Sequence, residues 1–304
     1  MKVTGLPPLG LLPLNSLLPL KLPLSASRLL PSRLAGLSMA LLKATALEIA
    51  ILAGHLLLYP SGIVQERRSG DAEPSPSGDT KQLPTEARPP VVLLHGFIDN
   101  RSVFVLLRRS LAQHGRQQLE SLNYSPLTCD VRTAAALLGR HIEEICRRTG
   151  SDRVDVVGHS LGGLIARYYV QRLGGDTRVR TLVTLGTPHS GTRVVPLANA
   201  HPVVRQMRPG SQLMDELSGP APGCRTQFVS FWSDLDHLMD PPEAARLDHP
   251  DLPAVNVQVT GIGHLALPVH PAVAARIRQA LDDAPATPAD SGTGAAATDG
   301  LTVA

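Results

Sequence analysis

Residues 154–163, Val-Asp-Val-Val-Gly-His-Ser-Leu-Gly-Gly, decide the fold of this chain. The apolar run at 154–157 predicts a buried strand, and the stretch from Leu161 to Leu173 predicts a helix. Between them, Gly-x-Ser-x-Gly puts Ser160 on a turn so tight that only small residues fit on either side of it. The five-residue pattern is weak by itself, but the strand before it and the helix after it agree with it. Ser160 is therefore the candidate nucleophile.

Composition excludes some classes of protein. The 304 residues carry a net charge of +3, but five of the 29 basic residues lie before Glu48, so the rest of the chain holds 24 basic and 26 acidic residues. A nearly neutral body without a basic patch gives no reason to expect nucleic-acid binding. The three cysteines lack C-x-x-C spacing, so we expect neither a zinc site nor a disulfide framework. They are Cys129, Cys146 and Cys224.

The N-terminal part of the chain is unlike the rest. Residues 1–34 form a Leu/Pro-rich tract that we expect to be disordered, because six prolines forbid a continuous helix. Residues 35–59 form an apolar stretch that predicts a helix long enough to cross a bilayer, although Glu48 and His55 are polar. The sequence leaves open a membrane anchor or uncleaved signal, a docked or interfacial helix, and a mispredicted start upstream of Met39. Residues 60–88 read as a linker and residues 283–304 as a disordered tail.

Short apolar runs alternate with helical patterns over residues 89–282. This alternation predicts an α/β fold, with a mostly parallel sheet of about six strands flanked by helices and ligands at the carboxyl ends of the strands. The predicted strands are Val91–Leu94, Leu119–Asn123, Val154–Val157, Val179–Leu185, Gln227–Phe231 and Val255–Val259. The predicted helices are Val103–His114, Thr133–Arg148, Leu161–Leu173 and Pro271–Leu281.

Two of the predicted strands end in short turns that contain glycine and polar residues. The first strand runs into His95-Gly96-Phe97, and the backbone N–H groups of Phe97 and Leu161 are the expected pair of donors to an oxyanion. We expect His95 to pack this loop rather than to transfer protons. The fourth strand ends in Gly186-Thr187-Pro188-His189, which we interpret as shaping the site, because a serine nucleophile needs only one base.

The base and the acid should follow the nucleophile in the chain. His264, in Gly261-Ile262-Gly263-His264, comes just after the last predicted strand and is the best candidate for the base, ahead of the histidines at 237, 249 and 270. The strand at 227–231 leads to three aspartates, and one of them should orient the imidazole. From the residues alone the alternatives are Asp234, Asp236 and Asp240.

With these motifs in place, residues 90–282 resemble the α/β-hydrolase lipases and esterases, in particular small bacterial triacylglycerol lipases and the related inositol-deacylase-like hydrolases. The resemblance rests on five motifs, which are His95-Gly96-Phe97, the Gly158–Gly163 turn, Gly186-Thr187-Pro188-His189, Ser233-x-x-Asp236 and Gly261-x-Gly263-His264. It implies an α/β-hydrolase fold, and it places the acid at the last position of Ser-x-x-Asp, which selects Asp236. One departure is Phe97 and Ile98, where many relatives carry smaller residues.

The resemblance also suggests where substrate binds. Lids of lipases occupy the position of Arg193–Arg225, and the five prolines of this short segment favour a small cap over a separate domain. Its apolar residues suit an acyl pocket or ordinary core packing. We name Val194, Leu197 and Met207 as candidate substrate-binding residues.

Together these features predict a serine ester hydrolase, a lipase or carboxylesterase without metal or cofactor, that acts on a lipid or other acyl ester. Ser160, Asp236 and His264 are the predicted triad, with the amides of Phe97 and Leu161 as the oxyanion hole. An acyltransferase or thioesterase would use the same triad, and a membrane-tethered interaction protein on a hydrolase scaffold is the non-catalytic alternative. We expect a protein that is membrane-associated, secreted or held in the cell envelope, with a cytoplasmic location left open. Residues 35–59 are the candidate contact with a membrane surface. Because every catalytic candidate follows Pro90, a chain starting near Pro84 is expected to remain active.

Overall fold

The computed structural model describes residues 42, 45–54, 88–97, 99–124, 130–194, 201–283 and 302–303. The chain divides into two units, Met1–Met39 and Ala40–Ala304, and every described residue belongs to the second. The predicted tract at 1–34 and nearly all of the predicted linker at 60–88 therefore lie outside the described residues.

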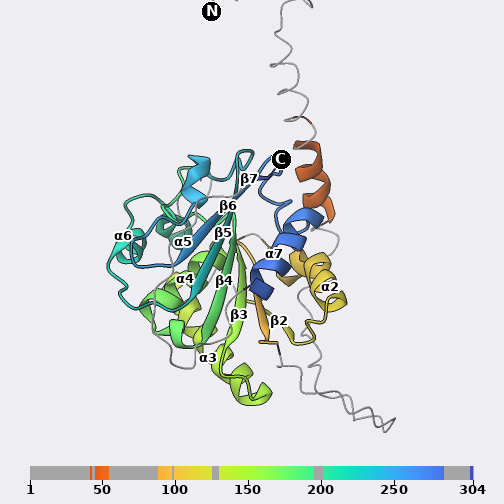
Figure 1. The fold of residues 1–304 in the computed structure, drawn as a ribbon. Helices are drawn as coiled ribbons and strands as arrows, with labels where there is room; N and C mark the ends of the chain where they lie inside the picture. The colour runs from red at the N-terminus through yellow and green to blue at the C-terminus, as the bar shows by residue number, and fades with distance from the viewer. Residues whose placement is uncertain are drawn as a thin grey trace, which may run out of the picture. The chain divides into compact units, whose positions relative to one another are not determined.

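A parallel sheet forms the centre of the second unit (Figure 1). Its strands follow the order β2-β1-β3-β4-β5-β6-β7, and every neighbouring pair is parallel, which confirms the predicted fold class. The first six strands are β1 (Val91–Leu94), β2 (Leu119–Leu122), β3 (Val154–His159), β4 (Val179–Leu185), β5 (Gln227–Ser233) and β6 (Ala254–Val259).

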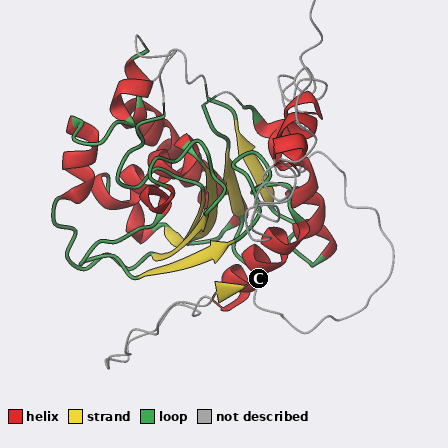
Figure 2. Cartoon of the chain, turned by 90° about the horizontal axis from the view of Figure 1, so that it is seen from above, coloured by secondary structure: helices red, strands yellow, loops and turns green. Residues whose placement is uncertain are grey.

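Helices cover both faces of the sheet (Figure 2). The α-helices between the strands are α2 (Val105–Gln113), α3 (Val131–Thr149), α4 (Leu161–Arg172), α5 (Pro202–Gln206), α6 (Gln212–Ser218) and α7 (Pro271–Asp283). Short 3-10 helices are η2 (Arg101–Phe104), η3 (Gly175–Thr177) and η4 (Pro242–Ala245). The bounds of α3 have clear local causes, because the Asp130 side chain accepts a hydrogen bond from the Thr133 N–H and Gly150 adopts a left-handed conformation after the helix.

Alternation along the strands creates two separate cores. Val92 and Leu94 of β1 point into a core built with α3, α4, α5 and α6, whereas Val91 and Leu93 point into a second core built with α2 and α7. Successive side chains of a strand face opposite sides of a sheet, so a strand that is buried on both faces needs a continuous apolar run. All four residues of β1 meet that requirement.

The register aligns the carboxyl ends of the central strands. Leu94 pairs with Gly158 and His159 pairs with Leu185, while Leu185 pairs with Phe231 and Ser233 pairs with Val259. The loops that leave β1, β3, β4, β5 and β6 therefore start along one edge of the sheet, which is where a ligand site is expected.

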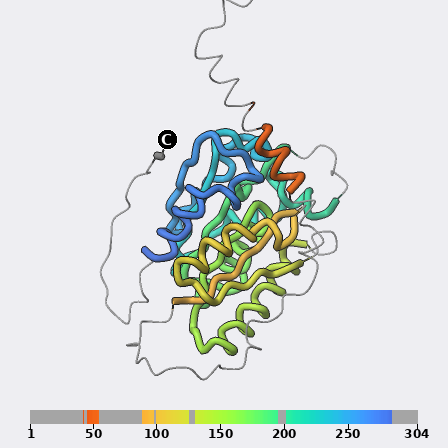
Figure 3. The backbone as a smooth tube through the Cα atoms, turned by 90° about the vertical axis from the view of Figure 1, so that its right-hand side faces the viewer, coloured from red at the N-terminus to blue at the C-terminus, as the bar shows by residue number. Residues whose placement is uncertain are grey.

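Residues 45–54, here called the N-terminal helix, lie beside the loop between β6 and α7, as the two views in Figures 1 and 3 show. Ile51 of this helix packs against the second core. This contact favours the docked alternative for the described part of residues 35–59, and contact with a membrane stays a prediction. Leu47, Ile49 and Leu52 are exposed. None of the helices in the described part of the chain combines the length and the apolar composition that crossing a bilayer requires.

Part of the C-terminal segment departs from its prediction. Residues 283–304 are predicted to be disordered, but Thr302–Val303 form the short strand β7, which pairs with Gln258 and Val259 of β6. Asp283 is the last residue of α7. Two consecutive β-favouring residues, Thr and Val, can extend a sheet edge even in a segment whose overall composition is poor in apolar residues. Residues 284–301 lie outside the described part of the chain.

Candidate active site

Ser160 occupies the sharp turn between β3 and α4. Its backbone has φ 52° and ψ −119°, and it is the one residue other than glycine with a positive φ in the described part of the chain. This region costs energy for a residue with a Cβ atom, and such strain is found where a side chain must be held for function. The Ser160 N–H donates to the carbonyl oxygen of Leu185 at 2.9 Å, which ties the turn to the end of β4.

The glycines around Ser160 are required by close backbone approaches. A Cβ atom at Gly158 would lie 2.6 Å from the Cα of Gly163, and one at Gly162 would lie 2.3 Å from the carbonyl oxygen of Leu94. One at Gly163 would lie 1.9 Å from the Oγ1 atom of Thr187. These contacts pack β3, α4 and β1 too closely for any larger residue, which explains the pattern that the sequence shows.

His264 and Asp236 form a buried pair at the same edge of the sheet. His264 Nδ1 lies 2.7 Å from Asp236 Oδ2, and the two side chains are 4% and 0% exposed. Asp236 follows β5 and His264 follows β6, so the pair joins two neighbouring loops. The second oxygen of Asp236 accepts the Leu238 N–H at 3.0 Å, which fixes the carboxylate. An ionised acid held in this way can select the imidazole tautomer that leaves Nε2 free to accept a proton.

The absence of a side chain at Gly186 lets the end of β4 lie close to the Asp236–His264 pair. Its φ is +53°, and a Cβ atom there would lie 2.8 Å from Asp236 Oδ2 and 2.9 Å from His264 Nδ1. The turn after β4 also supports Ser160, because Thr187 Oγ1 donates to the Ser160 carbonyl oxygen at 3.0 Å. This turn is thus in contact with all three predicted triad residues. The hydrogen bonds recorded among the described residues do not join Ser160 to His264 directly.

Opposing influences act on the pKa of His264. Burial lowers this pKa, but the charge and hydrogen bond of Asp236, together with the charges of Asp99 and Glu48, outweigh burial and leave the pKa above its ordinary value. The ring of His159 lies 4.7 Å from the His264 ring, and its Nε2 is 3.2 Å from the His264 carbonyl oxygen. The protonated form of His264 is therefore stabilised, which suits the predicted role of this residue as a base.

The predicted oxyanion loop lies against Ser160. A Cβ atom at Gly96 would be 3.4 Å from the Ser160 Cβ, so the backbone that leads to Phe97 passes close to the serine. Leu161 is the first residue of α4, and the first N–H groups of a helix have no acceptor within it. The role of the Phe97 and Leu161 amides as donors to an oxyanion stays a prediction.

His95 packs this loop, as its position in the sequence suggests. Its ring stacks on Tyr124 with centroids 4.4 Å apart, and the Tyr124 hydroxyl donates to the His95 carbonyl oxygen. The side chain is buried, and burial lowers the pKa of His95 despite the hydrogen bond to Gly96. A histidine kept neutral and stacked in this way braces the loop.

A second histidine and aspartate beside the site were not anticipated. His159 Nδ1 lies 3.4 Å from Asp99 Oδ2, and burial lowers the pKa of His159 even though Asp99 opposes this effect. His159 stands next to Ser160, so its closeness to the site could have been inferred from the sequence. Nothing in the sequence singles out Asp99, because only the folded loop after β1 brings it there.

The turn after β4 has the structural role that we expect. His189 is fully enclosed, and its Nε2 lies 2.9 Å from Thr184 Oγ1. Burial, followed by the charge of Arg167, lowers the pKa of His189 well below its ordinary value, so the ring is neutral. Arg167 donates to the His189 carbonyl oxygen at 2.9 Å and thereby ties the turn to α4.

The other candidates for acid and base have different partners. Asp234 accepts the Gly261 N–H at 3.2 Å, and the Asp240 N–H donates to Thr192 Oγ1 at 3.1 Å. His249 Nε2 lies 3.1 Å from the Gly219 carbonyl oxygen, and His270 precedes α7, where its Nδ1 accepts the Ala272 N–H. Of the three aspartates, Asp236 is the one whose carboxylate contacts His264.

The predicted cap is only partly described. Helices α5 and α6 form within it, Val194 is half-buried and residues 195–200, including Leu197, lie outside the described residues. Met207 is buried in the first core, among the apolar residues that α5 and α6 bring to it. Met207 therefore packs in the core, and the predicted contact of Met207 with substrate stays a prediction.

No group of three His, Cys, Asp or Glu side chains that could hold a metal ion occurs among the described residues. Cys146 and Cys224 are free thiols, and Cys129 lies outside the described part.

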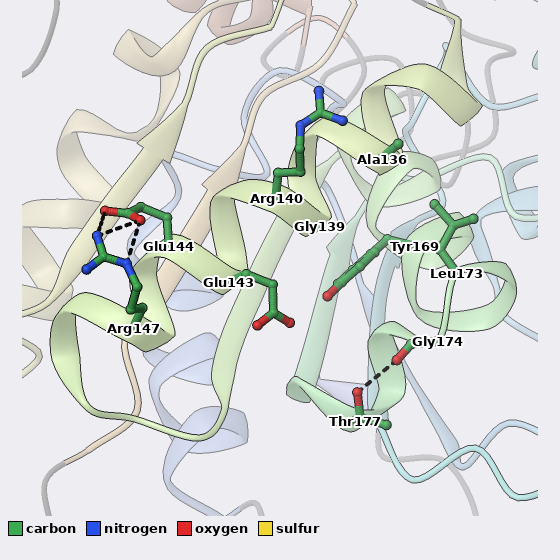
Figure 4. Close-up of a pocket in the computed structure, with 10 residues that line it drawn as sticks. All are labelled: Ala136, Gly139, Arg140, Glu143, Glu144, Arg147, Tyr169, Leu173, Gly174 and Thr177. Carbon is green, nitrogen blue, oxygen red and sulfur yellow. Dashed lines mark hydrogen bonds and ion pairs between the residues drawn. The ribbon is translucent and has the colours of Figure 1, made fainter.

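A surface pocket of about 820 Å³ lies between α3 and the end of α4 (Figure 4). Thr177 in its lining precedes the amino end of β4, so this pocket is at the opposite edge of the sheet from Ser160.

Comparison with known proteins gives three kinds of match. The family model described as palmitoyl protein thioesterase matches residues 90–237. A triacylglycerol lipase of Burkholderia plantarii is 27% identical over 126 residues, which cover 39% of this chain and 34% of that protein. The match to this relative therefore spans about a third of its length.

Solved lipase structures share the fold at low sequence identity. A Bacillus licheniformis lipase in its propeptide form superposes with a TM-score of 0.57 and 18% identity, covering 71% of this chain and 55% of that chain. Aspergillus fumigatus lipase B gives a TM-score of 0.59 at 17% identity, covering 66% of this chain and 54% of that chain. Taken with the sheet order and the Ser160 turn, these matches lead to one conclusion. The chain has the α/β-hydrolase fold and is similar to lipases, esterases and thioesterases of that fold.

Proposed function

We propose that this protein is a serine ester hydrolase, a lipase or carboxylesterase that cleaves acyl esters with an apolar chain. The observation that carries the proposal is the meeting at one sheet edge of a strained Ser160 with the buried His264–Asp236 pair. Acyl transfer by a serine needs a nucleophile, a base and an orienting acid in this relation. The triacylglycerol lipase relative supports a lipid or other acyl ester as the substrate class.

In the proposed reaction, Ser160 Oγ attacks the carbonyl carbon of the ester while His264 Nε2 takes the hydroxyl proton. Asp236 stabilises the imidazolium, and the N–H groups of Phe97 and Leu161 hold the oxyanion of the tetrahedral intermediate. Collapse of the intermediate expels the alcohol, which receives the proton from His264. Water then attacks the acyl enzyme while His264 takes a proton from it. The second tetrahedral intermediate collapses, the acid is released, and His264 returns the proton to Ser160 Oγ.

Thioester cleavage is the second candidate, and the palmitoyl protein thioesterase match favours it. A thiolate is a better leaving group than an alkoxide, so the same groups would serve both reactions. Comparing oxygen esters with thioesters of equal chain length, from two to sixteen carbons, separates the two. A preference of about tenfold or more for one series identifies the better substrate class.

Labelling with a fluorophosphonate probe tests the proposed nucleophile. The probe should label the wild-type protein at Ser160, and Ser160→Ala should lose both labelling and ester hydrolysis, with turnover reduced by several orders of magnitude. Thermal unfolding should be nearly unchanged, because one hydroxyl is removed from a partly exposed site. Retention of more than about a tenth of wild-type turnover would remove Ser160 from the mechanism.

A further inference from the structure

Glu48 of the N-terminal helix is bonded to the loop that carries His264. Its Oε2 accepts the N–H of Leu265 at 3.0 Å, and its Oε1 accepts the N–H of Ala266 at 3.0 Å. These two residues follow His264 directly, and both are buried. Each carboxylate oxygen thus satisfies one amide that would otherwise be buried without a partner.

The same carboxylate also touches the residue before His264. A Cβ atom at Gly263 would lie 2.5 Å from both the Cδ and the Oε1 of Glu48. A Cβ atom does not approach a non-bonded atom this closely, so the Glu48 carboxylate can lie here only while residue 263 has no side chain. Glu48 therefore contacts the backbone on both sides of His264.

The helix that carries Glu48 is fixed by a separate apolar contact. Ile51 lies three residues further along, on the same face of the helix, and packs against the second core. Two independent contacts, one polar and one apolar, thus hold this helix against the loop between β6 and α7.

We propose that Glu48 is a positioning residue, which holds the loop at 263–266 so that His264 faces Ser160. This inference rests on the proposed function, because it assigns His264 the role of the base. Its physical basis is that catalysis by an imidazole requires placement within a fraction of an ångström, and two charge-assisted hydrogen bonds to successive amides restrict the loop strongly. It also changes one expectation, since a chain that starts near Pro84 would lack Glu48 and should be impaired.

The pH dependence of turnover provides a second test of the proposal, because Glu48 is one of the charges around His264. The groups that face His264 are the carboxylates of Asp236, Asp99 and Glu48 and the neutral ring of His159. Removing the Glu48 charge takes away one of the three anions that favour the imidazolium form. The acidic limb of the pH–rate profile should therefore move to lower pH, which loss of packing alone would not produce.

The first experiment replaces Glu48 by glutamine in the full chain. An amide has one acceptor oxygen, so it cannot accept from both N–H groups in the same geometry, and hydrogen exchange at Leu265 and Ala266 should become about tenfold faster. Turnover of a short soluble ester at pH 8 should fall about ten- to a hundredfold with little change in KM. The matched control is Glu144→Gln on α3, whose carboxylate pairs with Arg147 at the surface and which should leave exchange, turnover and pH profile unchanged.

The second experiment is a double-mutant cycle between residues 48 and 263. Gly263→Ala should impair the wild-type protein, because the added methyl group collides with Glu48. In a Glu48→Ala background the methyl group has room, so the same change should have a much smaller effect on turnover. Equal effects of Gly263→Ala in the two backgrounds would show that the loop does not depend on Glu48.

The outcomes separate this inference from the proposed function. Unchanged amide exchange and an unchanged pH profile in Glu48→Gln, in a protein whose Ser160 is labelled, would overturn the positioning role alone. Failure of the wild-type protein to react at Ser160 would overturn the proposed function, and with it the role of His264 on which this inference depends. Faster exchange together with a shifted acidic limb supports it.

Discussion

At the scale of single residues, the backbone of Ser160 sets the site. Its positive φ is stabilised by neighbours that surround it, namely the carbonyl of Leu185, the hydroxyl of Thr187 and the close approach of Gly96. A strained conformation persists only where the surroundings fix it from several sides. The side chain is thus directed out of the turn before any substrate arrives, which lowers the cost of ordering it during a reaction.

The three aspartates after β5 should differ sharply in their effect on turnover. Asp236→Asn should lower turnover by about a thousandfold or more, because the imidazole loses the carboxylate that orients it. Asp234→Asn and Asp240→Asn should each stay within about tenfold of wild type, since their side chains do not contact His264. Measuring the three variants under identical conditions decides the matter. If Asp240→Asn were the inactive one, the assignment of Asp236 would have to be withdrawn.

Activity should depend on pH through His264, which must be neutral to take a proton. Burial lowers its pKa, but Asp236, Asp99 and Glu48 raise it above the ordinary 6.5, so activity is lost as the pH falls through that higher value. Asp99→Asn should move this acidic limb to lower pH, because one of the stabilising anions is gone. A profile of kcat/KM from pH 5 to 9 measures the shift. An unchanged limb would mean that Asp99 does not act on His264.

At the scale of elements, Arg167 connects α4 with its neighbours. Its guanidinium is buried and donates to the carbonyl oxygens of His189 and Leu217, at 2.9 and 2.8 Å. Burial lowers the pKa of Arg167 to about 9. These bonds join α4, which follows Ser160, to the turn after β4 and to α6. The predicted cap segment is thus attached to the elements around Ser160.

Replacing Arg167 should therefore loosen this attachment. Arg167→Met keeps the apolar stem but leaves the His189 carbonyl oxygen without its donor, and an unsatisfied buried group costs about 1–3 kcal/mol of unfolding free energy. Urea denaturation measures the loss. Arg147→Met, at an exposed pair on α3, is the control and should leave the stability nearly unchanged. Equal stability of the two variants would contradict the role of Arg167.

At the scale of the whole molecule, a network of buried ion pairs lies at the edge of the sheet opposite Ser160. Asp155 of β3 is fully buried and accepts from Arg116 at 3.0 Å and from Arg180 at 2.7 Å. Both arginines also donate to the carbonyl oxygen of Leu281 in α7. The network thus joins β3, β4 and α7 where the strands begin, whereas the predicted triad lies where strands end.

Asp155→Asn should destabilise the protein without changing its catalytic constants. Removing one partner of a buried ion pair leaves uncompensated charge, which typically costs about 3–5 kcal/mol. Urea unfolding measures this loss, and active-site titration before the assay corrects for the folded fraction. Glu144→Gln, at an exposed pair, should shift stability by less than about 1 kcal/mol. A comparably small effect of Asp155→Asn would show that the network is not needed for stability.

The sequence by itself determined the parallel sheet, the turn at Ser160 and the order of the candidate residues. These follow from local properties, namely apolar runs of strand length, helical periodicity and glycines where two backbones meet. The choice of Asp236 needed the family resemblance, because its two neighbours are carboxylates of the same kind in the same loop. Tertiary structure decided what no local pattern contains. It placed Asp99 beside His159, enclosed Met207 in the core and brought Glu48 across 217 positions to the amide of Leu265. Such contacts depend on how elements distant in the chain pack together, so they exist only in the folded molecule.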